Sequence, residues 1–501
     1  MLLKPETAPL LDALLRHKTS GAASFHVPGH KSGQGLDAYG DAFFRQIMAI
    51  DYTEITGLDD LHHPTGAIRE AQELAADCFG ADETYFLVGG STAGNLALIL
   101  STCSAGELLI VQRNVHKSVL NGIALSGARA VFLPCRLDEG SGLAAGVTPE
   151  DVHAALTRYP EAKAVFLTNP NYYGMTDNLT QVAEIVHAHG KPLLVDEAHG
   201  AHFGFHPALP ASALSCGADA VVQSTHKMLT AMTMGAMLHV KGQRLDQARI
   251  KGVLSTIQSS SPSYPILASL DLCRRQMHVS GQEFIEAGLA VVHELQSKSG
   301  EYQSLCILEH TFSSSYGTLD PFKIALNDKT GTLTGYALQE RIEMRGCMVE
   351  LADPQYALCL FSPASTLADA NRLHQVLREI DREIQQRGKE MDTFSANKTS
   401  TPFLTELSPP ISLPLSWLSL LNAATNQAQA MSLKHVEGLY AAEMVVPYPP
   451  GIPVLYPGER ISARMRDYLQ LLAESGARFQ GAHDPQLLTL LTTVQPMASL
   501  H

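Results

Sequence analysis

Short apolar segments without an alternating polar pattern recur between residues 66 and 270, and stretches with helical periodicity separate them. Examples are AVFLT at 164–168, PLLVD at 192–196 and DAVVQ at 219–223. Strands that are apolar on both faces are typical of a parallel sheet covered by helices on both sides. The sequence therefore predicts an α/β fold in which side chains that follow different strands can meet at one edge of the sheet.

Composition and charge exclude several classes of function. The formal net charge of the 501 residues is −14, and binding to nucleic-acid phosphates requires a basic surface, so no nucleic acid is expected as a partner. An acidic surface is compatible with a small cationic substrate, although acidity also serves solubility. No apolar run is long enough to predict a membrane span, and the N-terminal segment lacks the layout of a signal peptide. Eight scattered cysteines without a C-x-x-C pair indicate free thiols, and we expect a cytoplasmic protein.

A glycine-rich segment, GGSTAGN at 89–95, follows the predicted strand TYFLV and opens a helix. Its first two glycines allow the backbone to approach an anion closely. Ser91 and Thr92 would place hydroxyl and amide groups at the helix N-terminus, where the helix dipole favours a phosphate. The same residues also form ordinary helix caps, so the segment alone leaves both interpretations open.

The segment LLVDEAHG begins as an apolar strand that ends in Asp196. A carboxylate at the C-terminal end of a parallel strand faces the usual ligand crevice. An ionised Asp196 can keep a pyridine nitrogen protonated, and Ala198 is small enough for a flat ring to pack against it. A metal-binding or Walker-B-like acid and a plain strand-end cap are the alternatives.

Lys227 follows another buried strand, within QSTHKM at 223–228. Desolvation lowers the pKa of a lysine in such a place, which allows it to form a Schiff base with an aldehyde cofactor. Lys227 lies 31 residues after Asp196, a separation that accommodates one helix or loop and one strand, so both side chains can reach the same sheet edge. His116, in RNVHKS, follows a further strand and can stack on an aromatic ring, unless it is a surface histidine.

A phosphate cup, a ring-stacking residue, an acid for a pyridine nitrogen and a Schiff-base lysine occur in the order expected of a fold type I pyridoxal 5′-phosphate (PLP) enzyme. The sequence also resembles one family of these enzymes, the bacterial ornithine/lysine/arginine decarboxylases, in its short form without a receiver-like N-terminal domain. The resemblance covers about residues 25 to 480. The similar blocks include FHVPGHKSG (25–33), TEITGLDDLHHPTGAI (53–68), GGSTAGN, RNVHKS, DEAHGAHFGFH (196–206), QSTHKM, SSSPSYPILASLD (259–271) and AAEMVVPYPPGIPVLYPGE (441–459).

The resemblance implies a role for each matching residue. Lys227 would carry PLP as a Schiff base, Asp196 would pair with the pyridine nitrogen, and His116 would stack on the ring opposite Ala198. The residues expected to hold the phosphate are Ser91, Thr92, Ser224, His226 and Ser260, the last reaching the phosphate of a partner subunit. The residues expected to be catalytic are Lys227, His116, Asp196 and His226.

The fold class that follows is α/β: a PLP-dependent transferase-like (fold type I) large domain with a mostly parallel sheet, a smaller α/β domain and a C-terminal α+β module. Residues 391–415 are rich in Ser, Thr and Pro and indicate a linker. The expected parts are an N-terminal helix and loop arm (1–50), the PLP-binding large domain (51–275), the small domain (276–390), the linker (391–415) and the C-terminal decarboxylase domain (416–501).

Two other chemistries deserve comparison with decarboxylation. His199, His202 and His206 lie close together, but no Cys or second carboxylate is spaced to complete a metal site, so no metal is expected. A fold type I aminotransferase would anchor the substrate carboxylate with an arginine on a small-domain strand. The candidate strand, QYALCLFS at 355–362, contains no arginine, which favours decarboxylation. Possible substitutes for that arginine are Arg460, Arg464 and Arg466.

The expected substrate is a small cationic amino acid, namely arginine, lysine or ornithine, and the sequence does not distinguish among them. Each requires an acidic group at the far end of the binding pocket. The candidates are Glu54, Asp59, Asp60 and Glu443. The segments SSSPSY and HVPGHK are both placed to line a site shared between subunits if the resemblance holds, so a homodimer or a larger closed assembly is expected.

Overall fold

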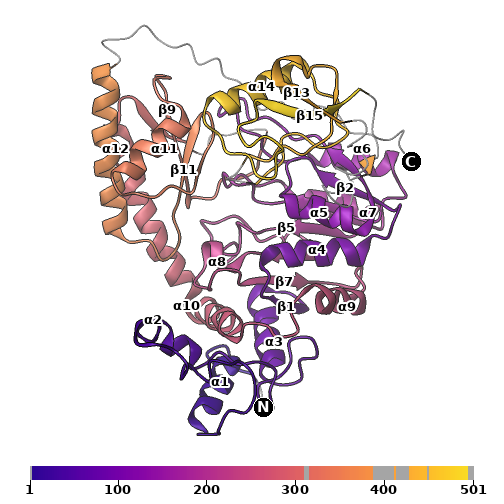
Figure 1. Cartoon of the computed structure of the whole chain (residues 1–501), viewed down its shortest axis with the longest axis vertical. Helices are drawn as coiled ribbons and strands as arrows, with labels where there is room; N and C mark the ends of the chain where they lie inside the picture. The colour runs from indigo at the N-terminus through magenta and orange to yellow at the C-terminus, as the bar shows by residue number, and fades with distance from the viewer. Residues whose placement is uncertain (1–2, 310–314, 388–410, 413–427, 448–450, 495–501) are drawn as a thin grey trace. The chain divides into compact units, whose positions relative to one another are not determined.

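The computed structural model describes residues 3–309, 315–387, 411–412, 428–447 and 451–494 (Figure 1). The chain divides into two compact units, each made of two stretches of sequence. The first unit contains Met1–Thr102 and Lys191–Ile285, and the second contains Cys103–Gly190 and Glu286–His501. Each unit carries part of the predicted site, and we describe them separately.

The sheet strands of the first unit follow the order β1 (Glu83–Leu87), β7 (Ala236–Val240), β6 (Ala220–Gln223) and β5 (Leu193–Asp196). Strands β5 and β6 are parallel, whereas β7 runs antiparallel to both β6 and β1. Strands β1, β5 and β6 therefore point the same way. Their carboxyl ends lie at one edge of the sheet, as the sequence predicted.

The first unit also contains several helices. They are α1 (Pro9–Thr19), α2 (Ala38–Met48), α3 (Ala67–Phe79), α4 (Gly90–Thr102), the short α8 (Thr225–Met228), α9 (Gln247–Ile257) and the first part of α10 (Tyr264–Gln296). Helix α4 packs closely on the sheet because Gly94 has no side chain: a Cβ atom there would lie 2.6 Å from Val222 Cγ1. Any larger residue at position 94 would push α4 away from β6.

The second unit contains three parallel strands in the order β4 (Val165–Thr168), β2 (Leu108–Gln112) and β3 (Arg129–Leu133). The short strand β12 (Ile411–Ser412) adds to β3 in antiparallel orientation. The helices α5 (Lys117–Ser126), α6 (Pro149–Arg158) and α7 (Leu179–Ala188) connect or follow these strands. Strands β2, β3 and β4 are buried on both faces, which explains the continuous apolar runs in the sequence.

Two smaller sheets complete the second unit. The first is antiparallel, in the order β10 (Leu351–Ala352), β11 (Tyr356–Leu360), β9 (Lys323–Asp328) and β8 (Leu305–Ile307), and it is accompanied by α11 (Gly335–Met344) and α12 (Leu367–Arg387). The second has the order β13 (Gln429–Ser432), β15 (Thr489–Thr493) and β14 (Tyr440–Ala441). It shares a hydrophobic core with α14 (Ala463–Glu474), shown in yellow in Figure 1.

The structure confirms the predicted fold class and corrects some details. The sequence prediction included a strand near 347–350, which the structure places instead at Leu351–Ala352. The sequence prediction named no strand at Ala236–Val240, although all five residues of this strand are buried. The predicted linker falls mostly outside the described residues. Among the helices that the structure describes, none is long and apolar enough to cross a membrane.

Candidate active site

Asp196 is the last residue of β5, and its carboxylate is buried with 2% of the residue exposed. The Asn95 side-chain amide, on α4, donates a hydrogen bond of 2.8 Å to Asp196 Oδ2, and the backbone N–H of Ala198 donates one of 3.1 Å to Oδ1. Burial raises the pKa of Asp196, and the contacts with Asn95 and Ala198 and the charge of Lys227 oppose that rise. A further cationic partner would stabilise the ionised form.

Lys227 lies on α8, immediately after β6, and is partly buried. Its Nζ atom is 3.0 Å from Nε2 of His199, which is buried in the segment that follows β5. The sequence analysis considered His199 only as a metal ligand and missed this contact. The signal that could have revealed it is position: His199 follows Asp196 by three residues, past the same strand end.

Hydroxyl groups gather where β1 and β6 end. Ser224 Oγ donates a hydrogen bond of 2.7 Å to Ser91 Oγ, in the first turn of α4. Gly90, just before Ser91, has a φ of 71°, which a residue with a side chain adopts only at a cost. Thr92 is exposed beside them. Thr225 Oγ1 is buried and has no hydrogen-bond partner among the described residues, so this group is available to an additional ligand.

His226 turns one ring nitrogen toward the backbone. Its Nδ1 lies 3.1 Å from the carbonyl oxygen of Gly235, and because a carbonyl only accepts, Nδ1 carries the proton. Burial lowers the pKa of His226, the bond to Gly235 partly opposes that shift, and the charge of Lys227 adds to it. His226 is therefore neutral near pH 7, with Nε2 as an acceptor.

A buried polar chain supports the strands beneath this edge. Gln223 Nε2 donates to Glu197 Oε2 (2.7 Å), Gln223 Oε1 accepts from His239 Nε2 (3.2 Å), and His239 Nδ1 is 2.8 Å from Thr84 Oγ1. This hydrogen-bond network runs from the residue after β5 across β6 and β7 to β1. Burial raises the pKa of Glu197 to about 8, against the hydrogen bonds from Gln223 and Ala213.

Two predicted site residues are not brought to this edge by the described contacts. His116 belongs to the second unit, where it caps α5, and its Nδ1 accepts hydrogen bonds from the Ser118 N–H (3.2 Å) and Ser118 Oγ (2.8 Å). Ser260 is exposed after the end of α9, in the first unit. The roles implied for both residues remain predictions.

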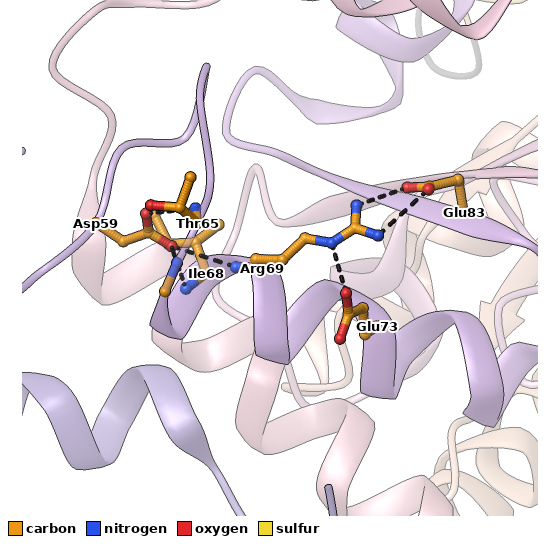
Figure 2. Close-up of polar contacts among 7 residues, drawn as sticks. Asp59, Thr65, Ile68, Arg69, Glu73 and Glu83 are labelled. Atoms are coloured by element: carbon orange, nitrogen blue, oxygen red, sulfur yellow. Dashed lines mark hydrogen bonds and ion pairs between the residues drawn. The ribbon is translucent and has the colours of Figure 1, made fainter. Parts of the chain in front are cut away.

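The structure assigns other partners to two of the acids expected to bind the substrate. Asp59 caps the start of α3: Oδ1 accepts from the Thr65 N–H, and Oδ2 accepts from Gly66, Ile68 and Arg69 (Figure 2). Burial alone would raise the pKa of Asp59, but these backbone N–H groups lower it overall. Arg69 extends from the same turn to Glu73 and Glu83.

Glu443 is also engaged by its own module. It is buried, and it accepts hydrogen bonds from the His483 N–H (2.6 Å) and the Leu491 N–H (2.7 Å). Of the remaining acids, Glu54 accepts from the Thr53 hydroxyl, and Asp60 accepts from the His62 N–H at 2.8 Å. Glu54 and Asp60 stay the better candidates, because the carboxylate of each accepts one hydrogen bond from the described residues rather than several.

The residues at this edge fit PLP. The paired hydroxyls of Ser91 and Ser224 and the unpartnered Thr225 hydroxyl suit a phosphate at the N-terminus of α4. The buried Asp196 suits a protonated pyridine nitrogen, and Lys227 supplies the amine. The described residues contain no group of three or more side chains that could hold a metal ion. Fold and site together define a fold type I PLP-dependent enzyme.

Comparisons with known proteins identify the family. The profile of the "Orn/Lys/Arg decarboxylase, major domain" matches residues 8–313, and that of the C-terminal domain matches residues 419–485. The chain therefore belongs to the Orn/Lys/Arg decarboxylase family. It is a PLP-dependent enzyme that decarboxylates a basic amino acid.

Two curated relatives and one solved structure illustrate the similarity. The chain is 39% identical over 477 residues to "Uncharacterized protein YaaO" of Bacillus subtilis (strain 168), covering 94% of this chain and 96% of the relative. It is 34% identical over 483 residues to an arginine decarboxylase of the same organism, covering 96% of each. The lysine decarboxylase LdcF of Francisella novicida shares the fold, with a TM-score of 0.79 at 20% identity, over 97% of this chain and 81% of that one.

Proposed function

We propose that the enzyme decarboxylates arginine, that Lys227 holds PLP covalently, and that Asp196, His199 and the Ser91–Ser224 pair position it. The observation that carries the catalytic assignment is the 3.0 Å contact between Lys227 Nζ and His199 Nε2, beside a buried carboxylate. The preference for arginine rests on the 34% identity to an arginine decarboxylase across nearly the whole chain.

When bound, PLP supplies an electron sink for the electron pair that remains on the substrate as CO2 departs. Asp196 would hold the proton on the pyridine nitrogen, which keeps the sink effective. Asn95 fixes the direction of that carboxylate through its 2.8 Å hydrogen bond. Burial excludes water around Asp196, so its charge acts in a low-dielectric setting where it has a larger effect.

His199 would move a proton at Lys227 Nζ. An amine attacks a carbonyl carbon only in its neutral form, whereas the negative charge of Asp196 favours the ammonium form of Lys227. His199 Nε2 is within hydrogen-bonding distance and can accept the excess proton. The same nitrogen can return that proton to Lys227 Nζ when the substrate amine displaces the lysine and Lys227 becomes a free amine.

The absence of an arginine from β11 supports decarboxylation over transamination. The Tyr356–Leu360 strand reads YALCL. Without a cationic clamp, the substrate carboxylate loses less solvation as CO2 leaves, and a weakly solvating site favours the transition state over the ground state. The guanidinium of arginine would be gripped at its other end by a carboxylate, for which Glu54 and Asp60 are the candidates.

A homodimer in the cytoplasm is the proposed working form. Helix α2 contains no buried residue, and its apolar side chains Tyr39, Phe43 and Phe44 are 80%, 69% and 55% exposed. Exposed aromatic side chains that cluster on one helix are typical of a surface that another copy covers. The exposed Ser260 would then be free to reach the phosphate of the neighbouring copy. The free cysteines support a reducing compartment.

The deciding experiment supplies arginine, lysine and ornithine separately to the PLP-loaded enzyme and follows CO2, the amine and keto acid. Stoichiometric CO2 and the amine from arginine support the proposal. A main product of keto acid would make the enzyme an aminotransferase, and preference for lysine or ornithine would overturn the substrate assignment. Borohydride reduction followed by peptide mapping should place the pyridoxyl group on Lys227, and Lys227→Ala should abolish both labelling and turnover.

A further inference from the structure

A cavity lies within the second unit. Its lining residues include none of those at the cofactor-binding edge of the first unit. It has a volume of about 100 Å³, which is room for roughly three water-sized groups. Its polar lining residues are Asp353, four tyrosines (Tyr172, Tyr173, Tyr336 and Tyr468) and the amides Asn114 and Asn171, and the other lining residues are aliphatic. The described residues that line it include no lysine or arginine.

Asp353 places a buried carboxyl group in the wall of this cavity. Its Oδ2 accepts a hydrogen bond from the Tyr173 hydroxyl, and its Oδ1 accepts from the N–H groups of Gln355 and Tyr356, each at 2.6 Å. Burial raises the pKa of Asp353, and these hydrogen bonds compensate only part of that rise. A bound cation would supply the compensation that the protein itself does not.

The tyrosines gather around that carboxylate. Burial raises the pKa of Tyr173, and the neighbouring Asp353, Tyr468 and Tyr336 add to the rise, which shows that these groups lie close together. The faces of phenol rings attract ammonium and guanidinium groups, most strongly where water is excluded. Aromatic rings next to a carboxylate therefore form a receptor for an organic cation rather than for an anion or a neutral molecule.

A wider groove leads away from the cavity. The two share Tyr336, Ala352 and Pro447, and the groove has a volume of about 830 Å³. On one side α11 contributes Glu340 and Glu343, and on the other side Arg478 is the cation among the described lining residues. A ligand with one positive end in the cavity could thus place a second positive end against the α11 acids.

We propose that this cavity binds a linear aliphatic cation with a primary amine or guanidinium head, the head resting against Asp353 among the tyrosines and the chain pointing toward Glu340 and Glu343. Amines of this kind are also the chemical class that decarboxylation of a basic amino acid yields, so occupancy would report product accumulation to the enzyme. Binding itself does not depend on which amino acid is the substrate.

The test is calorimetric titration of the PLP-loaded enzyme with 1,5-diaminopentane, agmatine and spermidine, with 1,5-pentanediol as the neutral isostere. Part of each sample is first reduced with borohydride, because an amine cannot condense with a cofactor already fixed to Lys227. Binding of at least one amine should persist in the reduced enzyme, and the diol should not bind. Amine binding that disappears on reduction, or equal binding of the diol, would overturn the proposal.

Variants locate the binding. Asp353→Asn should weaken amine binding about tenfold or more, because it removes the charged partner, and the exposed Glu340→Gln should weaken binding of the diamines but not of a monoamine. Glu474→Gln, on α14 with Tyr468 but outside both linings, is the matched control and should bind as the parent does. Unchanged affinity in both Asp353→Asn and Glu340→Gln would refute the site. If the enzyme binds no PLP or does not decarboxylate arginine, the proposed function is refuted. The titration of this cavity with amines can still be interpreted in that case.

Discussion

The guanidinium of Arg113 is held by both carboxylate oxygens of Glu459, at 2.8 and 2.9 Å, and lies 3.5 Å from the centre of the Tyr456 ring. Arg113 is only 1% exposed and also donates to the carbonyl oxygens of Pro453 and Val454. These bonds attach the segment after β2 to the C-terminal module of the second unit. The pair is buried, and breaking a buried pair leaves an uncompensated charge.

Glu459→Ala should therefore destabilise the protein by about 3–5 kcal/mol, measured as a lower urea midpoint. Asp41→Ala is the control, since it removes an exposed partner of Arg45 and should cost about 1 kcal/mol or less. A Glu459 variant as stable as the control would mean that water reaches Arg113 easily.

Asp196→Asn should lower kcat by at least about 100-fold, because it removes a preorganised charge from the reacting centre. Binding of PLP should weaken much less. Near-normal kinetics in this variant would remove Asp196 from the mechanism.

Asn95→Ala tests the positioning of Asp196 by a pH profile. Loss of the Asn95 hydrogen bond should raise the pKa of Asp196 further, since that bond favours the ionised form. Activity requires the carboxylate and is lost as pH falls through its pKa, so the acidic limb of the profile should move to higher pH. If the acidic limb of the profile stays in place and activity falls equally at every pH, Asn95 has a structural role only.

His199→Gln should retain PLP on Lys227 but lower kcat by about 100-fold or more, because an amide cannot exchange the proton that an imidazole can. Added imidazole should restore part of the activity of His199→Ala. Full activity in His199→Gln would show that its contact with Lys227 serves only packing.

Glu197 should make stability depend on pH. Its pKa is about 8 in the folded protein, above the ordinary value near 4.3. The folded state thus holds a proton that the unfolded state releases, and the associated stability is present below about pH 4 and is lost as pH rises through 8. The urea midpoint of the parent should fall between pH 5 and 8, and Glu197→Gln should flatten that fall. Identical slopes would show that Glu197 ionises without penalty.

Asp59→Ala should reduce stability without changing the affinity for substrate, because its carboxylate caps α3. Loss of a helix cap costs about 1–2 kcal/mol. Asp59→Asn should cost less, since its amide oxygen still accepts hydrogen bonds. A large rise in KM at unchanged stability would return Asp59 to the list of substrate-binding acids.

The rule that residues at the carboxyl ends of parallel strands meet at one sheet edge predicted where several site residues lie. Ser91, Asp196 and Ser224 each follow a strand whose apolar run is visible in the sequence, and β1, β5 and β6 bring them to one edge. Lys227 followed from the same argument. The expected domain boundaries and the roles of these residues, like those of His116 and Ser260, stay predictions.

Other features depend on tertiary structure that periodicity does not encode. The antiparallel direction of β7 is set by its partners and not by the sequence AMLHV, which suits either direction. The contact of His199 with Lys227 joins the segment after β5 to the short helix α8. Asp59 was one of several candidates because an acid that caps a helix and an acid that binds a substrate look alike in a sequence.

Gly94 sets the distance between helix α4 and the sheet edge that carries the candidate site. It lets α4 rest directly on β6, and the first turn of α4 carries the hydroxyl that meets Ser224. Asp196 is placed by β5 and Lys227 by the short helix that follows β6, whereas the turn proposed to bind phosphate is placed by the distance between α4 and the sheet. Phosphate binding and catalysis would thus depend on different structural elements, so a substitution could weaken one of them and leave the other intact.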